Sequence, residues 1–168
     1  ALVGVDNAAW LSDAAENRFK SFEAMIPEQY KKALSHRNKK IAIMYQIPYG
    51  MPMEDLKNAV KQGYFVFKIK SGAPGSQSEM IQADIERLSL IHQTLKDFRT
   101  EQTDNGKLIY TIDANARYEK KETLLKYLDH ARKIGAFDQI LLIEEPLNEN
   151  NEESVADIDL RIGADESV

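Results

Sequence analysis

The chain has 168 residues, of which 43% are hydrophobic and 29% charged, and this is enough apolar material for one compact domain with a buried core. A net charge of -5 gives no electrostatic reason to expect nucleic acid or an anionic membrane surface as a partner. No cysteine is present, which excludes disulfides and thiolate metal ligands. We therefore expect a protein that acts on a small molecule.

No targeting or membrane-spanning segment is visible in the sequence. The opening residues, ALVGVDNAAW, lack the basic start and long apolar run of a secretory signal. No apolar stretch approaches the ~20 residues that a membrane helix needs. The sequence thus predicts a soluble protein of cytoplasmic type, without a membrane as partner.

The first predicted element is an amphipathic helix. Asp6 or Asn7 can cap it, and Pro27 marks a turn near its end. Its apolar residues step by three or four positions, namely Leu11, Ala15, Phe19, Phe22 and Ile26. The basic stretch that follows, residues 31–40, is more typical of a solvated linker than of a phosphate site.

Strands and helices then alternate to the end of the sequence. Strands are predicted at residues 41–47, 64–70, 108–112, 140–143 and 160–163, and helices at 53–61, 81–98, 124–134 and, as a short one, 155–158. Such alternation is typical of a parallel sheet. A (β/α)8 barrel of TIM type has eight strands and ~250 residues, so we expect residues 1–168 to form an incomplete barrel, its first five strands with their helices.

Three carboxylates stand at the ends of successive predicted strands. Asp113 lies in YTIDANARY, Glu144 in LLIEEPL and Asp165 in IGADES. Because the carboxyl ends of barrel strands meet on one face, these acids can converge on one divalent cation. Oxygen ligands without histidine or thiolate favour Mg²⁺ over zinc.

The second predicted strand, YFVFKIK, adds two lysines to the same end of the sheet. Its alternation places Phe65, Phe67 and Ile69 on one face, and Lys68 and Lys70 on the other. Two inward lysines are costly in a dry core, so a carboxylate cluster or an anionic ligand is the natural compensation.

The alternation of the next two strands extends this polar face. Asp113 and Asn115 point the same way at the end of the third strand. On the fourth, Ile140, Leu142 and Glu144 are expected to share a face, which makes Glu144 a better ligand candidate than Glu145. The acidic residues after Pro146 are better explained as a solvated loop.

Other residues near the strand ends are weaker candidates. Tyr45, Gln46 and Tyr49 end the first strand and could line a substrate pocket, although packing is an equal explanation for the aromatic rings. The segment SGAPGSQSE could be a lid, or a simple turn capped by Ser76 or Ser78. The histidines, His36, His92 and His130, lie in a linker and on helices and favour packing or surface roles.

The four motifs together resemble a known family. KIK, DAN, IEEP and ADES, each at the end of a successive strand, are similar to the enolase superfamily, within it the mandelate racemase and muconate lactonizing enzyme group. The segment VGVDNAAW resembles the helix that leads into such barrels. Aspartate in ADES favours the muconate lactonizing subgroup.

This resemblance implies roles for the residues named above. Asp113, Glu144 and Asp165 would bind Mg²⁺, Lys70 would be a general acid and base, and Lys68 would support it. The family's second lysine lies on a sixth strand, and its capping domain sets the substrate, so we expect both to lie outside this chain and the isolated piece to be inactive. The family also implies a homo-oligomer of the full-length protein.

The activity implied is removal of the proton next to a substrate carboxylate, through an enediolate intermediate. A racemase, epimerase or cycloisomerase is the simplest form, and a sugar-acid dehydratase is the nearby alternative. A third hypothesis is a non-catalytic partial barrel that binds metal or a partner through its open edge.

Overall fold

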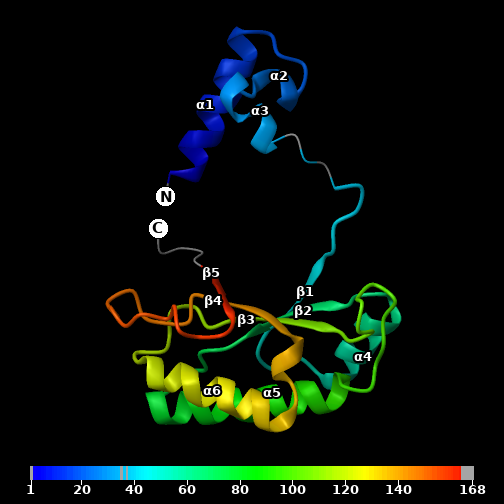
Figure 1. Cartoon of the computed structure of the whole chain (residues 1–168), viewed down its shortest axis with the longest axis vertical. Coiled ribbons are helices and arrows are strands. Elements are labelled where there is room, and N and C mark those ends of the chain that lie inside the picture. The colour runs from blue at the N-terminus through cyan, green and yellow to red at the C-terminus, as the bar shows by residue number, and fades with distance from the viewer. Residues whose placement is uncertain (1, 35, 37, 164–168) are drawn as a thin grey trace. The chain divides into compact units, whose positions relative to one another are not determined.

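The computed structural model describes residues 2–34, 36 and 38–163 and divides the chain into two compact units, Ala1–Ile41 and Ala42–Val168 (Figure 1). Within the first unit lie three helices, α1 Val3–Glu16, α2 Phe22–Met25 and α3 Glu28–Leu34. In the described part of this unit only Ile26 is a buried hydrophobic residue. The unit therefore has a small apolar interior, and the large core belongs to the second unit.

The single amphipathic helix predicted from Asp6 or Asn7 to Ile26 is wrong. The first helix starts at Val3 without a side-chain cap and ends at Glu16. Its end is a Schellman motif: Arg18 adopts φ 55°, its N–H donates to the carbonyl of Ala15, and the Phe19 N–H donates to the carbonyl of Ala14. The left-handed residue reverses the chain, so Phe22 falls on a separate short helix, while Phe19 precedes that helix and Ile26 is its C-cap.

The second unit is an α/β fold built on a five-stranded parallel sheet in the order β1-β2-β3-β4-β5. The strands are β1 Met44–Ile47, β2 Val66–Lys70, β3 Ile109–Asp113, β4 Ile140–Glu144 and β5 Arg161–Gly163. Each strand pairs with the next in sequence. The predicted alternation and the parallel sheet are thus confirmed, while closure into a barrel stays a prediction.

The β3–β4 pairing contains a register shift. Tyr110 pairs with Ile140, but Thr111 pairs with Leu142, so Leu141 is the extra residue of a bulge. Tyr110 belongs to the helix-covered face of the sheet, so its partner Ile140 lies on that face too. Leu142 and Glu144 lie on the opposite face. The expectation that all three share one face is wrong for Ile140, because alternation assumes a regular strand.

Three helices follow the first three strands. They are α4 Met53–Lys61, α5 Gln77–Leu95 and α6 Lys121–Ile134, and a 3-10 turn η1 Phe137–Gln139 precedes β4. Helices α4 and α6 end where the sequence predicts, whereas α5 ends before the expected Phe98. Ser76 caps α5 in a capping box with Glu79. Of the two expectations for the segment SGAPGSQSE, the structure therefore shows the turn capped by Ser76. Gly135 ends α6 at φ 78°.

The short helix expected at residues 155–158 does not form. The segment makes turns instead, with the Ile158 N–H donating to the Val155 carbonyl and the Leu160 N–H to the Ile158 carbonyl. Its neighbouring Asp and Asn residues compete for backbone hydrogen bonds, which favours turns over helix.

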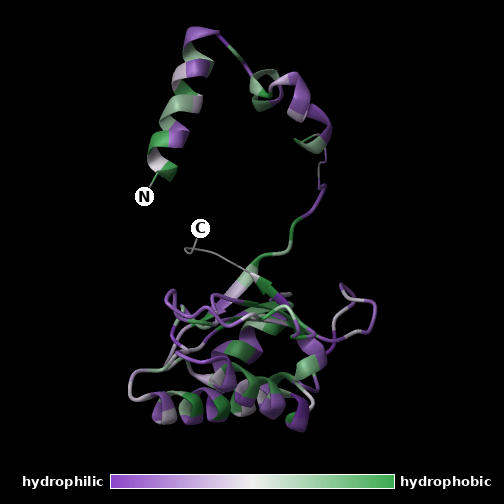
Figure 2. Ribbon diagram, turned by 60° about the vertical axis from the view of Figure 1, so that its left-hand side comes forward, coloured by the Kyte–Doolittle hydropathy of each residue, from purple (hydrophilic) through white to green (hydrophobic). Residues whose placement is uncertain are grey.

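All three long helices of the second unit cover one face of its sheet (Figure 1). Hydrophobic and hydrophilic residues alternate along them (Figure 2), as expected for helices that bury one face. The core between helices and sheet contains fully buried side chains from both layers, among them Phe67, Ile69, Leu88, Tyr110, Ile112, Tyr127, Leu128 and Ile143. Burial of these side chains provides the main stabilisation.

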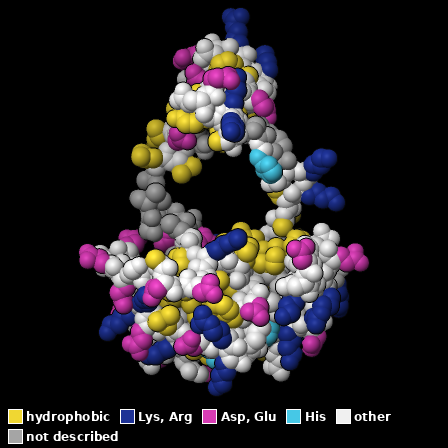
Figure 3. Space-filling model, viewed as in Figure 1, with side chains coloured by type: hydrophobic (Ala, Val, Ile, Leu, Met, Phe, Trp, Pro, Cys, Tyr) yellow, Lys and Arg dark blue, Asp and Glu magenta, His cyan; other side chains and the backbone are white. Residues whose placement is uncertain are grey.

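The surface carries charges of both signs in mixture, as the face drawn in Figure 3 shows. Among the described residues, no helix is both long enough and apolar enough to cross a membrane.

His92 makes the packing of α5 sensitive to pH. Its side chain is 6% exposed, and its Nδ1 lies 3.4 Å from the Tyr110 hydroxyl oxygen. Burial, helped by the charge of Lys96, lowers the pKa of His92. The unfolded chain therefore binds more protons at mildly acidic pH, and the stability that is full above the ordinary pKa of about 6.5 is lost as the pH falls.

We predict that the free energy of unfolding decreases between about pH 7 and pH 5, and that His92→Phe reduces this decrease because phenylalanine cannot take up a proton. Urea denaturation of both proteins at the two pH values measures it. Equal decreases in wild type and variant would contradict the role of His92.

Candidate active site

The sheet places the predicted site residues at the carboxyl ends of neighbouring strands. Lys70 pairs with Asp113, and Asp113 pairs with Glu144. One step earlier on β2, Lys68 pairs with Gln46 of β1 and Thr111 of β3. Partners in register share a face, so these residues line the face of the sheet opposite α4, α5 and α6.

Asp113 lies at the centre of this group. Its Oδ2 is 2.9 Å from the Nζ of Lys68 and also accepts a hydrogen bond from the Nζ of Lys70. The Nζ of Lys68 lies in addition 2.6 Å from the Oε2 of Glu144. Four charged groups from three strands thus form one connected network, with two cations facing two anions.

The network is partly withdrawn from solvent. The side chain of Asp113 is 2% exposed, against 18% for Lys68 and Glu144 and 24% for Lys70. Burial alone would raise the pKa of Asp113, but its hydrogen bonds to Lys70 and Lys68 outweigh this and lower it. Burial likewise opposes the charge on Lys68, yet hydrogen bonds to Glu144 and Asp113 raise its pKa.

Asn115 joins the network from the turn after β3. Its Oδ1 lies 3.3 Å from the Nζ of Lys70, and its backbone N–H donates to the Oδ1 of Asp113 at 3.1 Å. Asn115 and Ala116 both adopt left-handed φ, at 50° and 55°. Asparagine tolerates this conformation, so the turn brings its amide back over the strand end.

The remaining predicted residues are distributed differently. Gln46 is on the face of Lys68, while Tyr45 is on the opposite face, with its ring edge-on to Tyr64 at 5.0 Å and Phe67 at 5.9 Å. Tyr45 therefore does not join the network. The third proposed metal ligand, Asp165, lies outside the described residues.

A second buried carboxylate, Asp84 of α5, supports the site from below and was not identified from the sequence. Its Oδ2 accepts from the Gly72 N–H at 2.8 Å and the Tyr118 hydroxyl at 3.0 Å, and its Oδ1 accepts from the Ala73 N–H and the Tyr49 hydroxyl, both at 3.3 Å. These donors belong to the loops after β1, β2 and β3. Asp84 thus ties three strand ends to one helix.

The signal for Asp84 is present in the helix pattern. Met80, Asp84, Leu88 and Ile91 are all buried and recur at helical spacing, so an acid interrupts the apolar face of α5. A charged side chain on a core face is seldom buried without partners. Burial, together with the nearby Tyr127 and Asp84, also raises the pKa of Tyr118, which keeps this hydroxyl protonated as a donor.

Gly72, two residues after Lys70, makes a close contact with the next loop. It adopts φ +82°, and a Cβ there would lie 2.7 Å from the carbonyl oxygen of Ala114. The preceding Ser71 N–H donates to the carbonyl of Asp113 at 2.8 Å. The loops carrying Lys70 and Asn115 are therefore packed directly against each other.

The donor set fits a hard cation. Mg²⁺ is usually held by one or two carboxylates together with water and substrate oxygens, and Asp113 and Glu144 supply two carboxylates at one point. Among the described residues, no group of three or more acidic or histidine side chains is assembled in this way. Asp113 and Glu144 are thus the residues that could hold the ion.

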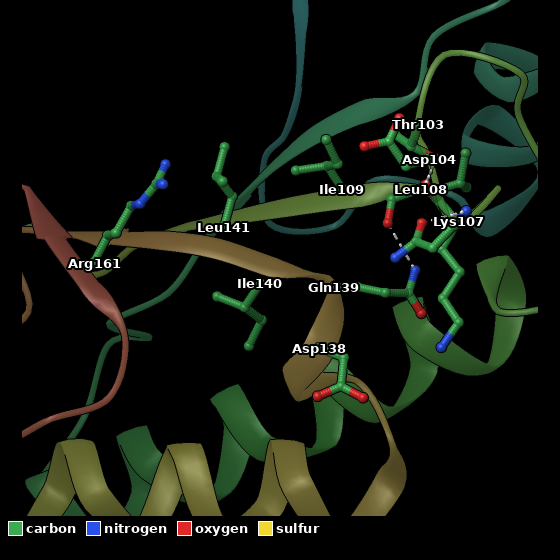
Figure 4. A pocket seen from close by; sticks show the side chains of 11 residues that line it. Thr103, Asp104, Lys107, Leu108, Ile109, Asp138, Gln139, Ile140, Leu141 and Arg161 are labelled. Carbon is green, nitrogen blue, oxygen red and sulfur yellow. Dashed lines mark hydrogen bonds between the residues drawn. The ribbon is translucent and has the colours of Figure 1, made fainter.

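Hollows elsewhere in the second unit do not include these residues. One of about 420 Å³ lies at the amino ends of β3, β4 and β5, where Figure 4 shows Asp138, Lys107 and Arg161 around it. Another, of about 380 Å³, is bordered by the acidic loop after β4. In that loop Glu153 accepts from the Lys121 N–H at 2.8 Å, which is a structural contact.

Comparison with known proteins yields only distant likeness to solved structures. No family model and no curated protein matches the chain. A crystal structure described as an unknown member of the enolase superfamily from Enterococcus faecalis V583 is 23% identical, with a TM-score of 0.36. The match covers 66% of this chain and 24% of that one, so this chain spans about a quarter of that protein. Values this low do not assign the chain to a family.

We predict that Asp84→Asn destabilises the second unit by about 2 kcal/mol, because the amide nitrogen cannot accept from Gly72 or Tyr118 and a buried donor loses its partner. Urea denaturation at neutral pH measures the change. Wild-type stability in this variant would show that the three loops do not depend on Asp84.

We also predict that Gly72→Ala costs about 3 kcal/mol, since the new methyl group meets the Ala114 carbonyl in addition to the strain of a left-handed residue. Gly135→Ala is the matched control. It has φ +78° but no atom within 4 Å of the added Cβ, so only the backbone strain of about 1 kcal/mol applies. Equal losses in the two variants would refute a special contact at Gly72.

Proposed function

We propose that this chain belongs to a Mg²⁺-dependent enzyme that removes the proton next to a substrate carboxylate. The observation that carries the proposal is the convergence of Lys68, Lys70, Asp113 and Glu144 at the ends of three adjacent parallel strands. The order of the KIK, DAN and IEEP motifs on these strands supports the enolase superfamily, with the mandelate racemase and muconate lactonizing enzyme group as the finer assignment.

Each residue has a defined task in this mechanism. Asp113 and Glu144 would hold Mg²⁺, which when bound withdraws negative charge from the substrate carboxylate. Lys70, beside them, would act as a neutral amine: it would take the proton from the adjacent carbon, become an ammonium group and leave an enediolate. Lys70 is 24% exposed and lies on the face of the sheet opposite α5 and α6. Its contact with Asn115 orients the amine.

The outcome of the reaction depends on where the proton returns. Return to the opposite face of the carbon gives a racemase or epimerase, and ring formation or opening gives a cycloisomerase. Loss of a neighbouring hydroxyl gives a sugar-acid dehydratase, the alternative within the same chemistry. All require an opposing acid or base, which is not among the residues brought together on the five described strands, so we expect no turnover from this piece alone.

A non-catalytic role is the second candidate. β1 and β5 each pair with one strand only among the described residues, so both edges of the sheet present unpaired backbone groups. A partial barrel of this kind could bind a partner through an edge. It would not require the lysine and carboxylate network.

We predict that Asp113→Asn and Glu144→Gln each weaken Mg²⁺ binding at least roughly tenfold, because each loses an anionic ligand. Isothermal titration calorimetry with MgCl₂ measures it, and circular dichroism verifies the fold. Glu149→Gln, an exposed residue of the acidic loop, is the matched control and should bind as wild type does.

Failure of wild type to bind Mg²⁺, or an equal loss in all three variants, would rule out the metal site. The partial-barrel hypothesis would then be favoured.

A further inference from the structure

The Nζ of Lys68 lies where a cation shared by Asp113 and Glu144 would have to bind. It is 2.9 Å from the Oδ2 of Asp113 and 2.6 Å from the Oε2 of Glu144. Both carboxylate oxygens thus face one position, which the nitrogen occupies. The ammonium group is thus bound by the same pair of oxygens that the proposed function assigns to Mg²⁺.

The Oδ2 atom of Asp113 already has two cationic partners, because it contacts both lysines. The Oδ1 atom accepts from the Asn115 N–H. The side chain is 2% exposed, so solvent offers no further approach. An ion that coordinates Oδ2 must therefore replace one of the two ammonium groups.

The two lysines differ in what they would lose. Lys70 keeps a second acceptor in Asn115 Oδ1 and does not contact Glu144 in the described network. Lys68 contacts both carboxylates and is the group between them. Lys68 is consequently the one that a bridging ion displaces.

We propose that Lys68 is a built-in competitor for the divalent cation: its ammonium group joins Asp113 and Glu144 when no metal is bound, and Mg²⁺ binds by displacing it. This rests on the proposed metal site. The lysine offsets the repulsion of the two carboxylates and so keeps the site assembled, but it lowers the affinity for the ion. Lys68 then acts on metal affinity, in addition to any role beside Lys70.

The test is Mg²⁺ affinity, measured by isothermal titration calorimetry on the full 168-residue chain. Lys68→Met removes the competitor and should tighten binding roughly tenfold, the value of one charge-assisted hydrogen bond. Lys70→Met removes an equal charge that also touches Asp113, and is the matched control for a general electrostatic effect. It should tighten binding clearly less.

Lys68→Arg keeps the charge and gives a second, independent readout. A guanidinium group binds carboxylates with two parallel hydrogen bonds, so this variant should bind Mg²⁺ no more tightly than wild type. In addition, NMR of the lysine side chains should show the Lys68 signals changing in proportion to Mg²⁺ occupancy. Circular dichroism establishes that each variant is folded, and if Lys68→Met is not, Lys68→Arg and the NMR titration decide.

The order Lys68→Met tightest, then Lys70→Met, then wild type, with Lys68→Arg no tighter, supports the proposal. Unchanged or weaker binding in Lys68→Met, equal gains in the two methionine variants, tighter binding in Lys68→Arg, or Lys68 signals that do not respond would overturn it. Any of these contradicting results would leave the proposed metal site intact, provided that wild type binds Mg²⁺ and Asp113→Asn does not. If neither wild type nor Lys68→Met binds, both proposals fall.

Discussion

The buried carboxylate of Asp84 is the contact on which the arrangement of the strand ends depends. It accepts four hydrogen bonds, two from backbone N–H groups and two from tyrosine hydroxyls. Burial of a charge is costly, and only donors from all three loops compensate for it. The helix–sheet interface therefore specifies where the loops after β1, β2 and β3 lie, and with them the ends of the strands that carry the lysines and Asp113.

The two faces of the sheet are stabilised in different ways. On the face covered by α4, α5 and α6, apolar side chains such as Phe67 and Ile112 are fully buried, and their burial supplies stability. The opposite face carries a partly exposed network of charged side chains that neutralise one another, namely Lys68, Lys70, Asp113 and Glu144. Such a network adds little net stability, but it holds charged groups together at one point.

Much of the fold and of the candidate site could be predicted from the sequence, because the spacing of apolar residues indicates which side chains are buried. The period of two in β2 separated Lys68 and Lys70 from Phe67 and Ile69, and helical spacing located α4, α5 and α6. Three things could not be predicted this way. The break of α1 depends on one left-handed residue, Arg18, the role of Asp84 depends on donors far away in sequence, and the bulge at Leu141 depends on pairing with β3.

The bulge in β4 has a consequence for how this chain can evolve. Counted from the Tyr110 and Ile140 pair, a regular strand would set Asp113 opposite Ile143 and turn Glu144 toward the helices; the extra residue restores the match of Asp113 with Glu144. Loss of Leu141 itself would leave a regular strand in which Glu144 still pairs with Asp113, whereas loss of a residue between Leu141 and Glu144, with the bulge kept, would turn the carboxylate toward the helices. The spacing between the bulge and Glu144 is therefore part of the site, together with the identity of the carboxylate.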